Sequence, residues 1–106
     1  DLDRAEDYAR TVFLARIRYE EGLAHKHEEY DEETARASLR RQPKIATGLE
    51  DMVYLFRHLT RKEATIQNLK DFLELVNAKR RVDAGVPEAE ALDPLFSRKF
   101  GTLMKK

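Results

Sequence analysis

Cysteine is absent from this chain of 106 residues, which excludes disulfides, thiolate metal sites and a cysteine nucleophile. No apolar run approaches the roughly 20 residues that a membrane-spanning helix needs, and no apolar run behind a basic amino end indicates a signal peptide. Twenty basic side chains balance twenty acidic ones, which argues against a general nucleic-acid binder or a strongly cationic membrane-surface protein. We therefore expect a soluble protein. Asp1 at its start fits either a trimmed chain or a mature chain whose targeting segment was removed.

Strand alternation, internal repeats and low-complexity segments are also lacking, and the apolar residues follow a helical period. The strongest stripe lies between residues 45 and 82, where apolar side chains recur at steps of three and four. Its members are Ile45, Leu49, Met52, Val53, Phe56 and Leu59, followed by Ile66, Leu69, Phe72, Leu73 and Val76. The pattern predicts an all-α fold in a single domain, a small bundle of two long central helices with shorter flanking helices. We expect residues 1–43 to form an N-terminal helix, an acidic turn and a short helix, 44–85 the central pair, and 86–106 a C-terminal tail with a short helix.

Residues with helix-capping chemistry predict where the central helices begin and end. Thr47 and Glu50 have the Ser/Thr-x-x-Glu spacing of a capping box, so we expect the first central helix to begin after Thr47. Thr60 and Glu63 repeat this spacing and predict a break near Thr60. Basic residues in the last turns, then Gly85 and a proline, predict the end of the second central helix.

The N-terminal segment predicts a helix over residues 3–21 that stops at Gly22, where glycine takes the left-handed conformation. The alternative is one helix that continues to Arg41, with Gly22 tolerated at a cost of about 1 kcal/mol. We favour the stop. Asp31 can then cap a short helix whose end is set by Pro43.

The C-terminal segment is too apolar for a free tail. Asp93 followed by Pro94 predicts the start of a short helix that reaches Phe100. The apolar residues of this segment are Leu95, Phe96, Phe100 and Leu103. We expect the segment to dock on the domain or on a partner.

The histidines and basic residues give only weak signals for chemistry. His25 and His27 point apart on a helix and lack a Glu-x-x-His partner, so we interpret them as solvated residues beside a turn. Arg18 and His25 match the loose Arg-x6-His spacing of helical RNases of the HEPN class, a spacing that arises often by chance in an arginine-rich sequence. The basic run at residues 79–81 complements a helix dipole more simply than it binds phosphate.

The acidic turn contains a Glu-Glu-x-x-Glu pattern that resembles half of a magnesium site. Glu28, Glu29 and Glu32 match the first half of the site in the all-helical nucleoside triphosphate pyrophosphohydrolases of the MazG type. Such a site gathers four carboxylates around ions that bridge phosphate oxygens and activate water. Asp51 stands where the last aspartate is expected, but Gly48 replaces the glutamate three residues before it. This enzyme is therefore an alternative interpretation, and an exposed acidic loop without metal or cofactor is the favoured one.

A different family resemblance covers about half of the chain. Its first part consists of Gly22-Leu23, Tyr30, Glu33 and Arg40-Arg41-Gln42-Pro43. This segment is similar to the Gly-Leu, acidic-turn, Arg-Arg-Leu-Pro pattern of the small non-catalytic matrix-side subunit of mitochondrial ubiquinol:cytochrome c oxidoreductase, the ubiquinone-binding-protein type. Its second part, similar to the end of plant-like members, consists of residues 69–76, Glu90-Ala91-Leu92, Pro94-Leu95-Phe96 and Arg98. The region after Pro43 lacks the basic helix and the Leu-Pro turn of that family.

The resemblance implies a non-catalytic subunit that stabilises the assembly of a respiratory membrane complex in electron transport. Its partners would be other protein subunits rather than nucleic acid, and it would lie peripherally on the matrix side of the mitochondrial inner membrane, or otherwise in the cytoplasm. The residues expected to contact partners are Tyr8, Phe13, Tyr30, Arg40, Arg41, Pro43, Leu95, Phe96 and Phe100. Besides the pyrophosphohydrolase, the second alternative is a free-standing helical adaptor or homodimer.

Overall fold

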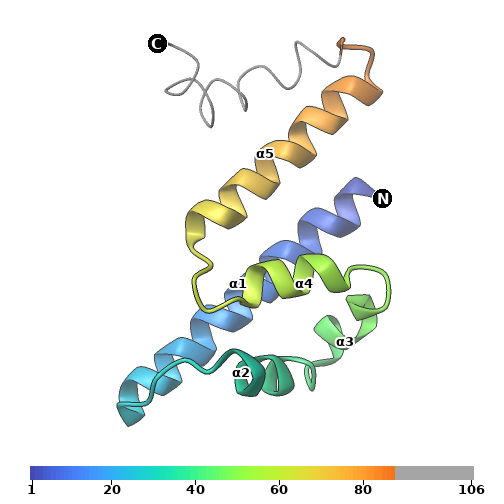
Figure 1. Ribbon diagram of the computed structural model, residues 1–106. Coiled ribbons are helices and arrows are strands. Elements are labelled where there is room, and N and C mark those ends of the chain that lie inside the picture. Colours follow the sequence, from blue (N-terminus) through green and yellow to red (C-terminus); the bar gives the residue numbers. More distant parts are fainter. Residues whose placement is uncertain (88–106) are drawn as a thin grey trace, which may run out of the picture. The chain divides into compact units, whose positions relative to one another are not determined.

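The computed structural model describes residues 1–87, which contain five helices and no strand (Figure 1). The helices are α1 (Leu2–Lys26), α2 (Glu32–Leu39), α3 (Pro43–Leu49), α4 (Val53–Thr60) and α5 (Ile66–Asp83). The predicted all-α class is confirmed for this part of the chain. The predicted helix from Asp93 to Phe100 and the apolar residues of the tail lie outside the described residues. Among the five helices, none has the length and apolar character needed to cross a membrane.

The chain divides into two compact units. Within the described chain, the first unit holds Asp1 and residues 3–69, and the second holds Leu2 and residues 70–87. α5 begins in the first unit and continues into the second. The expectation of a single domain stays a prediction.

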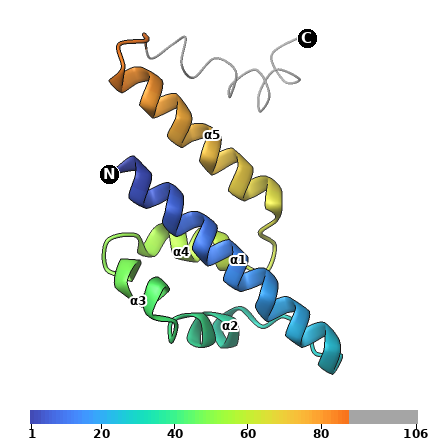
Figure 2. The ribbon, with the colours of Figure 1, turned by 180° about the vertical axis from the view of Figure 1, so that it is seen from behind.

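The core of the first unit lies between α1 and the three short helices that follow it. Figures 1 and 2, which view the ribbon from opposite sides, show α4 against α1, in front of it in one view and behind it in the other. The largest fully buried side chains of this core are Val12, Leu39, Ile45, Phe56, Leu59 and Thr60. Each helix therefore contributes one apolar face to a common interior, as the periodicity of the sequence indicates.

The first long central helix, expected to begin after Thr47 and to break near Thr60, is two short helices, and the prediction of its start is wrong. α3 begins at Pro43, whose fixed φ suits the first helical position, and α4 begins after Met52, whose φ of −126° and ψ of 35° interrupt the helix. The apolar period continues across the interruption because α3 and α4 both face the same core. Periodicity alone therefore hides the break.

The two predicted capping boxes are wrong, although the break near Thr60 is confirmed by the end of α4. The Thr47 hydroxyl donates to the Pro43 carbonyl over 2.6 Å, and the Thr60 hydroxyl donates to the Phe56 carbonyl over 2.7 Å. Both threonines thus lie in the last turns of helices and bond back by four residues instead of capping a new helix.

The predicted cap of α2 at Asp31 is confirmed. Its carboxylate accepts hydrogen bonds from the Thr34 hydroxyl and the Thr34 amide, over 2.6 and 2.9 Å. These bonds, chiefly the one from the hydroxyl, lower the pKa of Asp31. Asp31 therefore stays ionised at the positive end of α2, where a negative charge is favourable.

The stop predicted at Gly22 is wrong, because α1 continues to Lys26. His27, with a φ of 57°, takes the left-handed position instead. The amide of Glu28 donates to the Leu23 carbonyl over 2.9 Å and that of His27 to the Ala24 carbonyl, which is the Schellman pattern. Leu23 is buried, and its burial outweighs the small helical cost of glycine at position 22.

α5 ends where the sequence predicts its end, in a second Schellman pattern. Gly85 has a φ of 104°, and the amide of Val86 donates to the Arg81 carbonyl over 2.9 Å. The left-handed cap at Gly85 is therefore confirmed.

Replacing Gly22 by alanine tests the continuity of α1. The substitution Gly22→Ala meets no atom within 4 Å of the new Cβ, so we expect the free energy of unfolding to rise by about 0.5–1 kcal/mol. Urea denaturation followed by circular dichroism measures this change. A loss of stability would instead indicate a left-handed residue and a helix end at position 22.

Candidate functional site

A buried arginine closes the carboxyl end of α4. The Arg16 residue is only 2% exposed, and its guanidinium donates to the carbonyls of Leu59, over 3.0 Å, and of Arg61. A third carbonyl, that of Lys62, accepts over 3.1 Å, and the Glu20 carboxylate accepts from Nε over 2.6 Å. The buried Leu59 carbonyl has no partner inside α4, so Arg16 satisfies a group that would otherwise lack one, whereas the Arg61 carbonyl also accepts from the Ala64 amide.

Tyr30 adds a second contact to the same helix end. Its ring lies under the Arg16 guanidinium, with 4.4 Å between Cζ and the ring centroid, and its hydroxyl donates to the Thr60 carbonyl. Burial raises the pKa of Tyr30, and the nearby Arg16 charge opposes that rise in part. The phenol therefore stays neutral near pH 7 and remains a donor.

Arg36 reaches the end of α4 from α2. It donates to the Thr60 hydroxyl and to the Arg57 carbonyl, both over 3.0 Å, and pairs with Glu32 over 2.8 Å. The other oxygen of Glu32 accepts from the Lys62 amide over 3.0 Å. We call Arg16, Tyr30, Glu32, Arg36 and Thr60 the helix-end network. Among residues 1–87, no buried side-chain nitrogen or oxygen lacks a hydrogen-bond partner.

Removal of the Arg16 guanidinium should lower the stability of the first unit. In Arg16→Met an apolar side chain replaces the guanidinium and the buried Leu59 carbonyl loses its donor, so we expect a loss of about 2–4 kcal/mol in the free energy of unfolding. Arg18→Met is the matched control, because Arg18 lies exposed on the same helix and should change stability by less than about 0.5 kcal/mol. Equal midpoints for the two variants in urea would contradict a structural role for Arg16.

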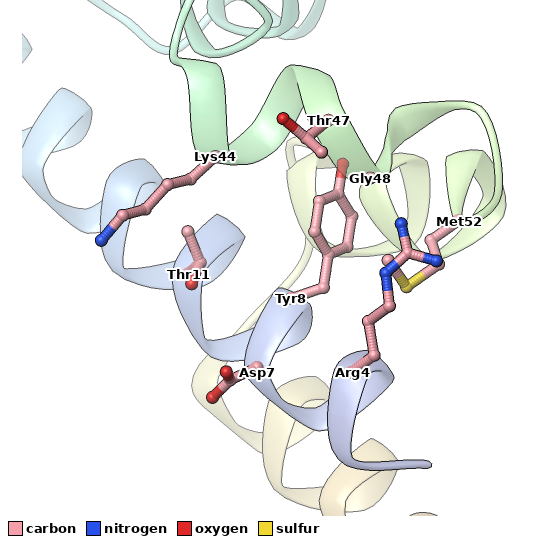
Figure 3. A pocket seen from close by; sticks show the side chains of 8 residues that line it. All are labelled: Arg4, Asp7, Tyr8, Thr11, Lys44, Thr47, Gly48 and Met52. Carbon is pink, nitrogen blue, oxygen red and sulfur yellow. The ribbon is translucent and has the colours of Figure 1, made fainter. Parts of the chain in front are cut away.

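A cleft of about 510 Å³ lies between the first half of α1 and α3 (Figure 3). Its lining residues are Arg4, Asp7, Tyr8, Thr11, Lys44, Thr47, Gly48 and Met52. The Tyr8 side chain points from α1 toward α3, where its hydroxyl donates to the Ile45 carbonyl over 2.8 Å. Burial raises the pKa of Tyr8, so its phenol holds the proton that this bond requires. We call this space the α1–α3 cleft.

Gly48 allows the Tyr8 ring to pack against α3. A Cβ at position 48 would lie 2.5 Å from Cε1 of Tyr8 and 2.9 Å from Cε of Met52. The methionine can move, but the ring is held by its hydroxyl bond and by burial. Close approach of α1 and α3 therefore requires glycine at this position.

Alanine at position 48 should destabilise the protein, in contrast to alanine at position 22. We expect Gly48→Ala to lower the free energy of unfolding by about 1–3 kcal/mol, because the Tyr8 ring must shift. Gly22→Ala controls for the gain in helix propensity. Denaturation of both variants in urea measures the difference, and an equal gain of stability in both would contradict the close packing.

The carboxylates of the alternative metal set are not gathered. Asp51 pairs with Arg4 over 2.6 Å, and Glu32 pairs with Arg36. Glu28 and Glu29 lie exposed in the turn between α1 and α2. Over the described part of the chain, no group of three or more histidine, aspartate or glutamate side chains is placed to hold a metal ion.

The residues expected to contact partners fall into three groups. Tyr8 and Phe13 lie in the core of the first unit, and Tyr30 belongs to the helix-end network. Arg40 and Arg41 are exposed at the end of α2, and Pro43 is exposed at the start of α3. The remaining three, Leu95, Phe96 and Phe100, lie outside the described residues.

Neither Arg16 nor Arg36 is among the site residues expected from the sequence. One signal for Arg16 was present: it follows Val12 by four residues and therefore falls on the apolar face of α1. A charged residue on such a face predicts a buried charge with partners. Nothing comparable marks Arg36.

Arginines also line a second, smaller cleft, between α2 and α4. It has a volume of about 310 Å³ and is lined by Glu33, Arg36, Arg40 and Arg57. The Arg40 guanidinium lies over the fully buried ring of Phe56, with 5.7 Å between Cζ and the ring centroid. We call this space the arginine cleft.

Comparison with protein families, with curated proteins and with solved structures finds no match to this chain.

Proposed function

We propose that this protein is a non-catalytic structural subunit that binds other polypeptides through the outer surfaces of its helices. The observation that carries this proposal is Tyr54, which is 85% exposed on α4. The opposite face of the same helix supplies Phe56 and Leu59 to the core. Tyrosine is enriched at protein interfaces, where a partner covers its ring and its hydroxyl finds a hydrogen bond.

Further support comes from two apolar side chains on α1. Leu14 is 49% and Ile17 38% exposed, and residues three apart lie next to each other on a helix surface. A partner that covered such side chains would gain apolar burial.

The inner polar groups support a structural role as well. Arg16, Tyr30 and Arg36 each donate to backbone carbonyls of the first unit, and so does Tyr8. These groups are used to hold helices together. Chemistry at any of them would therefore disturb the fold.

The particular assembly that we propose is a mitochondrial respiratory membrane complex, with the chain peripheral on the matrix face of the inner membrane. The support is the resemblance of the segment from Gly22 to Pro43 to the small matrix-side subunit of ubiquinol:cytochrome c oxidoreductase. The chain would stabilise the assembly and would have no reaction of its own.

Native electrophoresis of a mild detergent extract tests the proposal with the endogenous tagged chain. We expect the chain to migrate with ubiquinol:cytochrome c oxidoreductase, and Tyr54→Ser to be lost from the complex at a lower detergent concentration because it lacks the ring. A truncated interface aromatic typically costs about 1–2 kcal/mol, so the retained fraction should fall severalfold or more. Tyr54→Phe, which keeps the ring, is the matched control.

Migration of the chain alone would contradict the subunit proposal. A monomer or dimer with cooperative melting would then favour the adaptor or homodimer. Retention of Tyr54→Ser equal to that of the control would instead exclude the face around Tyr54 as the contact.

A further inference from the structure

We propose that the arginine cleft binds carboxylate side chains of an acidic segment in a partner polypeptide. This inference rests on the proposed function and names the chemistry of the partner. Three guanidiniums, from Arg36, Arg40 and Arg57, line one concave space between α2 and α4. Arginine presents a planar fork of N–H donors that matches a carboxylate with two parallel hydrogen bonds.

Within the described residues, Arg40 is held by an aromatic ring and not by hydrogen bonds from its guanidinium. Its guanidinium lies over the Phe56 ring, and Phe56 is fully buried in the core of the first unit. A contact between a cation and a ring restrains the side chain while the N–H groups remain open to another acceptor. Arg40 is therefore oriented before any partner arrives, which lowers the entropic cost of binding.

Arg57 and Arg40 keep their charges available. Within residues 1–87, neither forms a salt bridge, whereas Arg36 in the same cleft pairs with Glu32. Arg36 is fixed further by its bonds to the Thr60 hydroxyl and the Arg57 carbonyl. Arg36 is thus fixed as part of the lining of the cleft, and Arg40 and Arg57 are the residues that attract an anion.

Glu33 favours a polypeptide over a phosphate group. Its carboxylate shares the cleft with the arginines and would repel a phosphate dianion about twice as strongly as a single carboxylate, because the dianion carries about twice the charge. A peptide brings backbone N–H donors together with its acidic side chains. Glu33 can accept such a donor while Arg40 and Arg57 bind the carboxylates.

The test is fluorescence anisotropy of the purified full chain with fluorescein-labelled hexaglutamate, compared with labelled hexaglutamine. We expect hexaglutamate to bind and the double variant Arg40→Gln/Arg57→Gln to bind it at least tenfold more weakly. Arg10→Gln/Arg18→Gln is the matched control, since it removes the same charge from exposed positions on α1 that line neither cleft. The control should stay within twofold, and Arg57→Gln alone should give an intermediate affinity.

Several outcomes overturn the inference. Equal weakening in both double variants would mean attraction by net charge alone, and equal binding of hexaglutamine would remove the role of carboxylates. Displacement by inorganic phosphate at the concentration of the peptide, or preference for phosphatidylglycerol vesicles, would assign the cleft to phosphate groups. Circular dichroism melts identify a variant that no longer folds. If the double variant does not fold, the affinity of Arg57→Gln with an unchanged melt decides whether the cleft binds hexaglutamate.

Failure of this inference is distinguishable from failure of the proposed function. If the cleft does not bind hexaglutamate but the chain migrates with the complex, only the partner chemistry is wrong. If binding depends on the cleft while the endogenous chain migrates alone, the subunit proposal fails.

Discussion

The guanidinium of Arg16 is the constraint on which the first unit depends. A helix that ends inside a packed unit leaves carbonyls without a partner inside the helix. Arg16 donates to the carbonyl of Leu59 in the last turn of α4 and to those of Arg61 and Lys62 just beyond it, from a helix more than forty residues earlier in the chain. A charged side chain with donors on several edges can do this, whereas an apolar residue of the same size offers no donor to any of them. The interaction therefore sets both the position of α4 on α1 and the direction in which the chain leaves α4.

The rest of the helix-end network extends this constraint to α2. Tyr30 and Arg36 bring the turn before α2 and α2 itself to the same helix end, and Glu32 joins them to the amide of Lys62. Because these contacts are polar and directional, they fix orientation more tightly than apolar packing does. One consequence is that the arginine cleft lies beside the network, so the residues that position α2 also shape the surface proposed to bind a partner.

Two acidic residues that resemble metal ligands in the sequence form ion pairs with arginines in the first unit. Glu32 and Asp51 belong to a set that resembles magnesium ligands, yet each is paired with an arginine, Arg36 and Arg4 respectively. A carboxylate in such a pair supports the fold and is less available to a cation. The proposed function accordingly assigns recognition to outward-facing side chains, such as Tyr54 on α4 and the two arginines of the cleft that form no salt bridge within residues 1–87.

The sequence alone determined the helical class, the cap at Asp31, the end of α5 at Gly85 and the break after Thr60. These features depend on the chemistry of a few neighbouring residues, so they can be read locally. Tertiary structure decided that α1 passes Gly22, because burial of Leu23 exceeds a local cost, and that the stripe after Ile45 divides into α3 and α4 around the Tyr8 ring. It also decided the candidate site, because Arg16, Arg36 and the carbonyls that they bind are more than twenty residues apart in sequence. Hydrogen bonds between such distant groups leave no periodic signal, and only the packed helices bring donor and acceptor together.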